Sequence, residues 1–91
     1  MQDLNHRLPQ ERNVTTAIPG PRSQELNAAR ESELAAGVIP GYPSYITDGD
    51  GGVLLDVDGN TIIDFASGIA VTSVGASNQR VAKAVAEAAS H

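Results

Sequence analysis

The sequence predicts a small α/β segment, locally of the α+β kind, in which a helix, an antiparallel hairpin sheet, a loop and a second helix follow one another. Residues 23–37 and 79–91 have the apolar spacing and capping residues of helices. Between them, short β-rich runs alternate with glycine-rich turns in the stretch DGDGGVLLDVDGNTIIDF, residues 48–65. Hydrophobic residues make up 41% of the 91 residues, which is enough for one globular segment with a modest core.

The N-terminal part of the chain precedes any element of regular structure. Residues 1–22 are polar and contain three prolines, so they are expected to form a flexible arm that lies on a partner. Ser23 is then a suitable N-cap for the first helix. Gly37 occupies the position at which a glycine commonly ends a helix. A proline-punctuated connector at residues 38–45 leads to the strands.

Three strand-like runs follow the connector, with the sequences SYIT, GVLLDV and NTIIDF. Asp58 and Gly59 separate the last two runs, and an Asp-Gly pair between β-rich runs favours a two-residue hairpin turn with positive φ at both positions. This turn predicts a register in which Leu55 faces Ile62. The result is a small antiparallel sheet.

The stretch ASGIAVTSVGAS, rich in small residues, is expected to be an extended loop. Ser77 or Asn78 then caps the second helix, which spans residues 79–91. Its apolar residues recur at helical spacing and form one face: Val81, Ala84, Val85 and Ala88. Because no stop signal follows this helix, we expect the sequence to be a truncated piece of a longer chain.

Charge and composition exclude several classes of function. The formal net charge is −5, and the six basic residues are scattered, so no nucleic-acid surface is expected. The chain has no cysteine, which excludes disulfides and cysteine-based zinc sites and favours a reducing compartment. No apolar run resembles a signal peptide or reaches membrane-spanning length. A soluble, cytoplasmic chain without a membrane partner is therefore expected.

Five aspartates in residues 48–65 raise the question of a calcium site. An EF-hand loop needs regularly spaced oxygen ligands, a glycine at its bend and a bidentate glutamate at its end. The frames that begin at Asp48 and at Asp56 both lack the bend glycine and the final glutamate. We therefore expect turn aspartates that accept hydrogen bonds from nearby backbone, rather than a small calcium-binding module.

The residues taken alone predict no complete active site. His6 and His91 lie at opposite ends of the sequence, so neither a metal pair nor a catalytic histidine is expected. Lys83 lies off the apolar face of the second helix, where solvated lysine is usual. The glycine-containing loops match neither a Walker nor a dinucleotide fingerprint. No catalytic or metal-binding residue is predicted.

The run DVDGNTIIDFASGIAVTSVGASNQRVAKAV, residues 56–85, resembles the N-terminal region of the class III pyridoxal-phosphate-dependent aminotransferases. In that family a hairpin turn leads to an Ile/Leu-Asp strand, a GIAV run, a glycine-containing loop and a helix. Together with IPGPRSQEL at residues 18–26, the SGIAV form is most similar to the 4-aminobutyrate (GABA) aminotransferase branch. The resemblance covers about residues 17–91. Gln79 departs from it, since the family often has proline before this helix.

The resemblance implies a transaminase that moves the amino group of 4-aminobutyrate to 2-oxoglutarate through pyridoxal phosphate. It implies the type I pyridoxal-phosphate fold and a homodimer with active sites at the subunit interface. Residues 23–91 would be part of the small N-terminal domain, truncated and inactive alone. Two alternatives stay open: a donor of the ornithine or acetylornithine type, and a non-catalytic remnant that acts as an interaction module.

The resemblance carries few site residues onto this chain. Ile69 matches a position that lines the substrate pocket as an apolar wall, and Gly68 would let the backbone pass close by. The alternative that Ile69 only belongs to the core of the small domain stays open. The residues that bind pyridoxal phosphate lie beyond residue 91 in the family, and Lys83 does not match its Schiff-base lysine.

Overall fold

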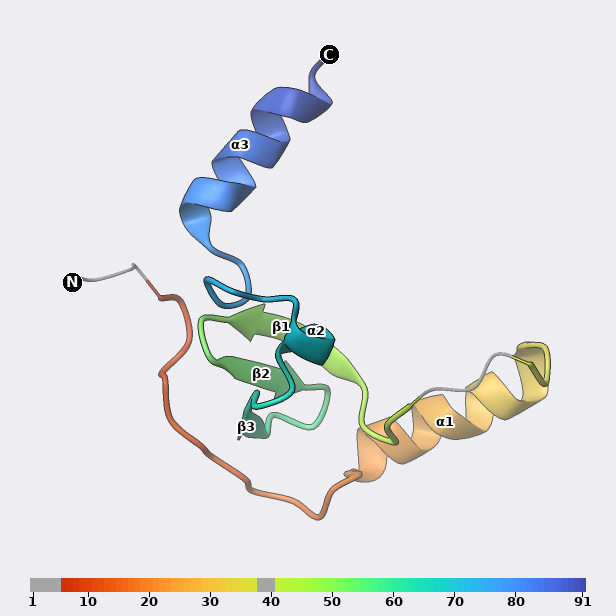
Figure 1. Ribbon diagram of the computed structural model, residues 1–91. Helices are drawn as coiled ribbons and strands as arrows, with labels where there is room; N and C mark the ends of the chain where they lie inside the picture. The colour runs from red at the N-terminus through yellow and green to blue at the C-terminus, as the bar shows by residue number, and fades with distance from the viewer. Residues whose placement is uncertain (1–5, 38–40) are drawn as a thin grey trace.

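The computed structural model describes residues 6–37 and 41–91; residues 1–5 of the predicted arm and 38–40 of the predicted connector lie outside the described residues. The elements follow in this order: α1 (Pro21–Glu33), β1 (Ile46–Asp50), β2 (Val53–Asp56), β3 (Thr61–Ile63), α2 (Ser67–Ala70) and α3 (Gln79–Ala89). The strands form one antiparallel sheet in the order β1-β2-β3 (Figure 1). The predicted order of helix, small antiparallel sheet and helix is confirmed.

Helix α1 begins three residues earlier than predicted. Gly20 is its N-cap residue and makes no side-chain cap, and Pro21 takes the first helical position. Proline suits that position because its fixed φ matches the helix and its missing N–H would have no partner there. Ser23 is therefore not the N-cap. It lies inside the helix, fully buried, and its Oγ accepts the backbone N–H of Tyr45 at 3.0 Å.

The end of α1 also differs from the prediction. The helix stops at Glu33, and Leu34 adopts an extended conformation with φ −102° and ψ 153°. Gly37 therefore does not end the helix. Leu34 is 52% exposed, so a further turn would have little apolar surface to bury. Most helical stability in proteins comes from such packing, which accounts for the early stop.

The β2–β3 hairpin has a different register from the predicted one. Leu55 pairs with Thr61 rather than with Ile62, and Leu54 pairs with Ile62. The loop holds three residues, because the Asp56 N–H donates to the Asn60 carbonyl at 2.9 Å. Gly59 has φ +85° and is the only turn residue with positive φ. The extra loop residue shifts the register by one and exchanges the faces of the strand residues.

Residues 6–20 run along the sheet of their own chain as irregular backbone (Figure 1). Asn13 and Thr61 exchange two backbone hydrogen bonds of 2.8 Å, so the arm pairs with β3 at that point. The Asn60 Oδ1 accepts the N–H groups of Thr15 at 2.7 Å and Thr16 at 3.0 Å. The arm thereby satisfies polar groups along the edge of the sheet.

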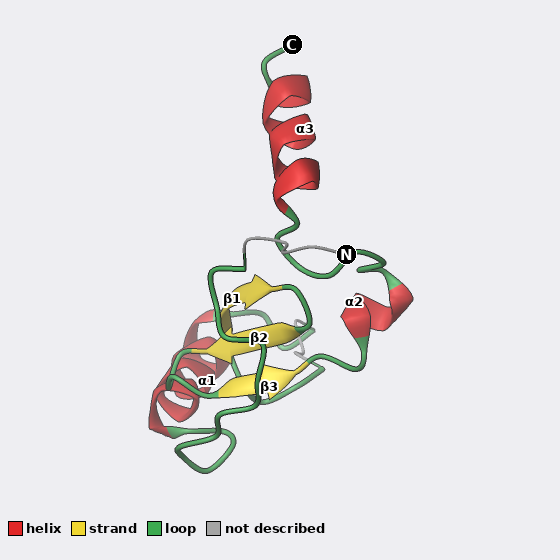
Figure 2. Cartoon of the chain, turned by 90° about the vertical axis from the view of Figure 1, so that its left-hand side faces the viewer, coloured by secondary structure: helices red, strands yellow, loops and turns green. Residues whose placement is uncertain are grey.

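The interior of this segment is small and mainly polar. Val53 is the one buried hydrophobic residue among those described, whereas Asp56 and Asn60 are each at most 1% exposed. In Figure 1, helix α1 lies below and to the right of the sheet and α2 lies in front of the end of the sheet, while α3 extends away from it, as Figure 2 also shows. Asn78 caps α3, as one of the two predicted residues, and no residue of α3 is buried. None of the described helices is long and apolar enough to cross a membrane.

Candidate functional site

The segment between β3 and α3 contains a left-handed turn. Ser67–Ala70 have φ values between 52° and 64°, and only Gly68 among them is a glycine. Left-handed backbone costs an L residue about 1–2 kcal/mol, and it is rare for a β-branched residue such as Ile69. The extended loop predicted for ASGIAVTSVGAS is therefore wrong at residues 67–70. Strained backbone of this kind clusters at functional sites in proteins, which directs attention to what surrounds the turn.

Asp64 anchors the entry to this turn. Its Oδ1 accepts the backbone N–H of Ser67 at 2.9 Å. Two backbone bonds close the turn itself, from Ala70 N–H to the Ala66 carbonyl at 3.0 Å and from Val71 N–H to the Ser67 carbonyl at 2.6 Å. The side chain that follows β3 thus fixes the direction in which the strained turn leaves the sheet.

The turn borders the larger of two cavities beside it, with a volume of about 640 Å³. Leu54 and Ile62, which are paired across β2 and β3, supply apolar wall from the sheet. Gly68 and Ile69 lie together at the same cavity, and the Ile69 side chain is 91% exposed. The two residues expected to contact substrate are therefore neighbours at one apolar cavity, and Ile69 is not buried within this chain.

The backbone conformation at position 68 favours glycine, whereas the space around it would admit a side chain. A Cβ added there would lie 3.6 Å from the Val71 Cβ and 3.8 Å from Thr72 Cγ2, which are ordinary contacts. Its φ of +63° is the conformation that favours glycine. Within the described part of the chain, no close approach of another segment accounts for this glycine.

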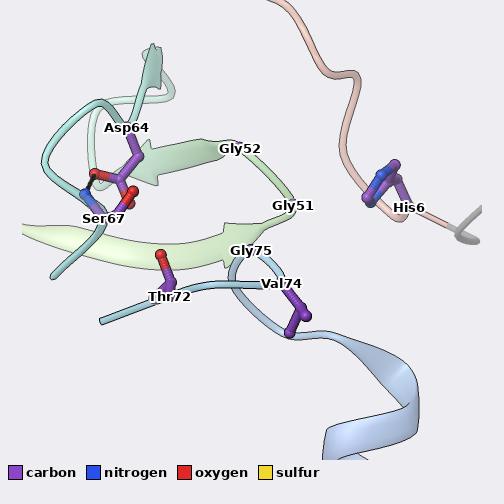
Figure 3. A pocket seen from close by; sticks show the side chains of 8 residues that line it. All are labelled: His6, Gly51, Gly52, Asp64, Ser67, Thr72, Val74 and Gly75. Atoms are coloured by element: carbon purple, nitrogen blue, oxygen red, sulfur yellow. Dashed lines mark hydrogen bonds between the residues drawn. The ribbon is translucent and has the colours of Figure 1, made fainter. Parts of the chain in front are cut away.

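A second, more polar cavity of about 340 Å³ also borders this segment (Figure 3). Figure 3 shows the Asp64 and Ser67 side chains at one end and His6, from the arm, at the other. Asp64 and Thr72 line both cavities. The polar cavity also has glycine backbone in its wall: Gly51, Gly52 and Gly75.

Two glycines allow the loops around the polar cavity to touch. Gly51 and Ala76 exchange two backbone hydrogen bonds of 2.8 Å, which joins the β1–β2 turn to the segment before α3. A Cβ at Gly75 would lie 2.7 Å from the Gly51 carbonyl oxygen, too close for any other residue without movement. Gly75 also has φ +82°. The segment that carries the left-handed turn is therefore held at both ends.

The aspartates of β1 bind the N-terminal arm. Arg7 makes two 3.0 Å hydrogen bonds to the Asp48 carboxylate, and this guanidinium holds the pKa of Asp48 below its usual value. Burial alone would raise the pKa of Asp50, but the N–H of Leu8 at 2.7 Å, His6 and the N–H of Arg7 together lower it. Both carboxylates are thus stabilised in their charged form.

The aspartates that raised the question of a metal accept hydrogen bonds instead. Asp56 Oδ1 accepts the N–H groups of Asp58 and Asn60, both at 2.9 Å. Asp58 accepts two N–H groups at the start of α1. Within residues 6–37 and 41–91, no group of three His, Cys, Asp or Glu side chains is placed to hold a metal ion.

Comparison with known proteins identifies the family. The model of the class III aminotransferases matches residues 37–91. The chain belongs to the class III aminotransferases. It is 46% identical over 78 residues to the 4-aminobutyrate aminotransferase of Mycobacterium tuberculosis, which covers 86% of the chain and 17% of that relative. It is 47% identical over 76 residues to the 4-aminobutyrate aminotransferase of Mycobacterium leprae, which covers 84% of this chain and 17% of that relative.

A more distant relative has a different activity in its name. The alanine/serine racemase of Pyrococcus horikoshii is 39% identical over 75 residues, which cover 81% of this aminotransferase chain and 16% of the racemase. The chain therefore spans about a sixth of the length of these relatives. The predicted resemblance to class III aminotransferases is confirmed.

Aminotransferases of this family depend on pyridoxal phosphate, but the two cavities beside the left-handed turn do not fit it. Lys83 is the only lysine of the sequence, and it is exposed on α3 and lines neither cavity. No described arginine or lysine lines either cavity to neutralise a phosphate group. Neither of these two cavities thus offers a set of residues suited to holding the cofactor.

Sequence reasoning placed Ile69 and Gly68 but missed three polar residues at the larger cavity: Ser44, Asp64 and Thr72. The Asp64-x-x-Ser67 spacing was an available signal, because an aspartate often accepts the backbone N–H a few residues further on. No motif in the neighbouring sequence indicates that Ser44 belongs to a site. Ser44 lies at the cavity only because of the tertiary fold.

Proposed function

We propose that this chain is the N-terminal part of an aminotransferase that moves the amino group of 4-aminobutyrate to 2-oxoglutarate, with pyridoxal phosphate as cofactor. The observation that supports this function is the identity of 46–47% to two mycobacterial 4-aminobutyrate aminotransferases over most of the chain. Because the aligned part is 17% of those proteins, we expect the isolated chain to be inactive. The cofactor supplies the electron sink for amino transfer when it is bound.

In this proposal Ile69 and Gly68 contact the substrate. Ile69 would present its side chain to the methylene groups of 4-aminobutyrate, because contact between the two removes apolar surface from water and is therefore favourable. Its 91% exposure leaves that side chain free of this chain's own interior. Gly68 would allow the left-handed turn that directs Ile69 outward, because its φ is +63°.

The same proposal includes the wider architecture. The type I pyridoxal-phosphate fold, the homodimer and the cytoplasmic location belong to the complete enzyme. Residues 23–91 would be part of the small domain, and residues 1–22 an N-terminal arm whose described part pairs with β3 at Asn13 and enters α1 at Pro21. The match of residues 37–91 to the aminotransferase family supports placing most of residues 23–91 in that enzyme.

A chimeric enzyme tests the proposed function. Residues 17–91 of this chain would replace the aligned segment of the Mycobacterium tuberculosis relative, and glutamate formation from 2-oxoglutarate would be measured with 4-aminobutyrate as donor. We expect kcat/KM within about tenfold of the parent enzyme, a difference of about 1.4 kcal/mol. A chimera that binds its cofactor but prefers ornithine or acetylornithine would overturn the donor. A soluble, cofactor-loaded chimera without activity toward any of these donors would overturn the function.

A further inference from the structure

A side chain of the N-terminal arm bonds to both sides of the β1–β2 turn. The Gln10 Nε2 donates to the Asp50 carbonyl at 2.8 Å, and the Gln10 Oε1 accepts the Gly52 N–H at 2.9 Å. The same Nε2 donates to the Leu8 carbonyl at 3.0 Å, which ties the amide to its own arm. A Cβ at Gly51, between the two contacts, would collide with Gln10 Oε1. The Gln10 amide therefore packs directly over the backbone of this turn.

The β1–β2 turn also holds both ends of the segment that carries the left-handed turn. At the start of that segment the Gly52 carbonyl accepts the Asp64 N–H at 2.9 Å. At its end Gly51 and Ala76 exchange two backbone hydrogen bonds of 2.8 Å. Two adjacent glycines thus set the distance that residues 64–76 must span, and fixed ends reduce the conformational freedom of a loop.

Hydrogen bonds inside the segment link these ends to the left-handed turn. The Asp64 Oδ1 accepts the Ser67 N–H at 2.9 Å. From the other end, the Thr72 carbonyl accepts the Gly75 N–H at 3.1 Å, and the Ser67 carbonyl accepts the Thr72 N–H at 3.0 Å. Three of the four residues of Ser67–Ala70 are not glycine yet have positive φ, and such backbone persists only where its surroundings hold it. A displaced β1–β2 turn would therefore release this strained backbone.

We propose that Gln10 is a positioning residue for the substrate segment, residues 64–76. Its amide holds the β1–β2 turn, that turn holds the substrate segment at both ends, and the segment in this conformation presents Ile69 to the larger cavity. Gln10 does not line that cavity and acts through the segment. The positioning belongs to this chain alone, whereas its effect on catalysis rests on the proposed function, in which Ile69 contacts the substrate.

Hydrogen exchange in the full 91-residue chain tests the positioning. Gln10→Met keeps the length of the side chain and removes its three hydrogen bonds. We expect the backbone amides of Asp64 and Ala76 to exchange about threefold to tenfold faster, as follows from the loss of hydrogen bonds of ordinary strength. The amide NMR signals of Ile69 and Ala70 should shift, because the turn loses its positive φ.

Arg7→Met is the matched control. The Arg7 guanidinium also makes three hydrogen bonds from the arm, two to the Asp48 carboxylate and one to the Gly49 carbonyl. These bonds go to β1 itself and not to the turn that follows it. Exchange at Asp64 and Ala76 should therefore stay within about twofold of the parent in this variant.

Three results of the exchange experiment would overturn the proposal. Equal acceleration in the two variants would show that the arm stabilises the sheet in general, without a specific role for Gln10. Parent-like exchange rates and signals in Gln10→Met would show that the segment keeps its conformation without this amide. A poorly dispersed amide spectrum of the parent would also count against it, since a chain without ordered packing holds no segment in place.

Kinetics separate positioning from a loss of folded protein. In a longer chimera, residues 1–91 replace the N-terminal region of the Mycobacterium tuberculosis relative up to the end of the aligned segment. Gln10→Met should raise the KM for 4-aminobutyrate about threefold and change kcat by less than about twofold, because a misplaced apolar wall weakens ground state and transition state equally. Loss of folded enzyme would instead lower the apparent kcat at an unchanged KM. Arg7→Met should keep both constants of the parent.

An inactive chimera and an unchanged KM have different consequences. A cofactor-loaded chimera without activity toward 4-aminobutyrate would overturn the proposed function, while the exchange rates of the chain would still decide whether Gln10 positions the segment. An active chimera in which Gln10→Met has the KM of the parent would overturn Gln10 as a positioning residue and leave the proposed function intact.

Discussion

The Asp58 carboxylate caps the helix in which Ser23 is buried. Its Oδ2 accepts the Ser23 N–H at 3.1 Å, and its Oδ1 accepts the Arg22 N–H at 2.6 Å. A negative side chain at this place satisfies two N–H groups that have no partner in the helix and interacts favourably with the helix dipole. The β2–β3 turn therefore stabilises the first turn of α1 across 35 residues of sequence.

Removal of this cap should destabilise the chain. We expect Asp58→Ala to lower the free energy of unfolding by about 1–2 kcal/mol, the usual cost of losing an N-cap side chain. Asp58→Asn should cost less, because the amide oxygen can still accept an N–H. Urea unfolding followed by circular dichroism measures both. Glu25→Gln, an exposed change in α1, is the control, and an Asp58→Ala midpoint equal to that of the control would exclude the capping role.

Substitution of the N-cap residue should act through the same contact. A Cβ at Gly20 would collide with the Asp58 carboxylate, so we expect Gly20→Ala to displace that side chain and to lower stability by about 1–2 kcal/mol. The double variant Gly20→Ala/Asp58→Ala should then be less destabilised than the sum of the two single variants. Urea midpoints of the four proteins complete this cycle. Strict additivity would show that the two residues act independently.

The elements of this fold were predictable because their signals are local, whereas their ends and pairing were not. The hairpin and α3 follow from Asp58-Gly59 and from the Asn78 cap, each within a few residues of the element it sets. The start of α1 depends on a cap from Asp58 and not from Ser23. Asp58 lies 35 residues after Ser23, so the sequence near the helix does not reveal this contact. The predicted register was wrong because the loop has three residues, one more than the two-residue turn expected from the Asp-Gly pair.

The candidate site was predictable only in part. Ile69 and Gly68 came from family resemblance, and the structure places them at one cavity. The left-handed turn was missed because its positive φ values fall mainly on residues other than glycine, which no propensity favours. Ser44 was missed because its burial depends on segments distant in sequence.

The hydrogen bonds of Asp48 and Asp50 predict a loss of stability in acid. Both carboxylates have a lowered pKa in the folded chain, so their contribution is complete above the unfolded pKa, about 3.9 for an aspartate, and is lost as the pH falls through the folded value. We expect the urea midpoint to fall below about pH 4. Asp50→Asn should lower the midpoint at neutral pH and flatten the acid decline; a variant with the parent's full decline would contradict this assignment.

The left-handed turn predicts opposite effects of two neighbouring Ala→Gly changes. Ala70 has φ +62°, so Ala70→Gly should relieve strain and stabilise the chain by about 1 kcal/mol. Ala66 has φ −77°, so Ala66→Gly should only increase the entropy of the unfolded chain and destabilise it by about 0.5–1 kcal/mol. Urea midpoints distinguish the two. Destabilisation of similar size in both variants would show that the turn is not left-handed in solution.

The proposed substrate contact of Ile69 predicts a selective kinetic effect in the chimeric enzyme. If Ile69 forms an apolar wall for 4-aminobutyrate, Ile69→Ala should remove about 1 kcal/mol of binding and raise KM by about fivefold. The value of kcat should change little, because such contact is made equally in the ground state and the transition state. Val71→Ala is the matched control, since Val71 is also exposed, at 70%, but does not line the larger cavity. An unchanged KM in Ile69→Ala would remove Ile69 from the substrate site, and an equal rise in both variants would indicate a general disturbance of the turn.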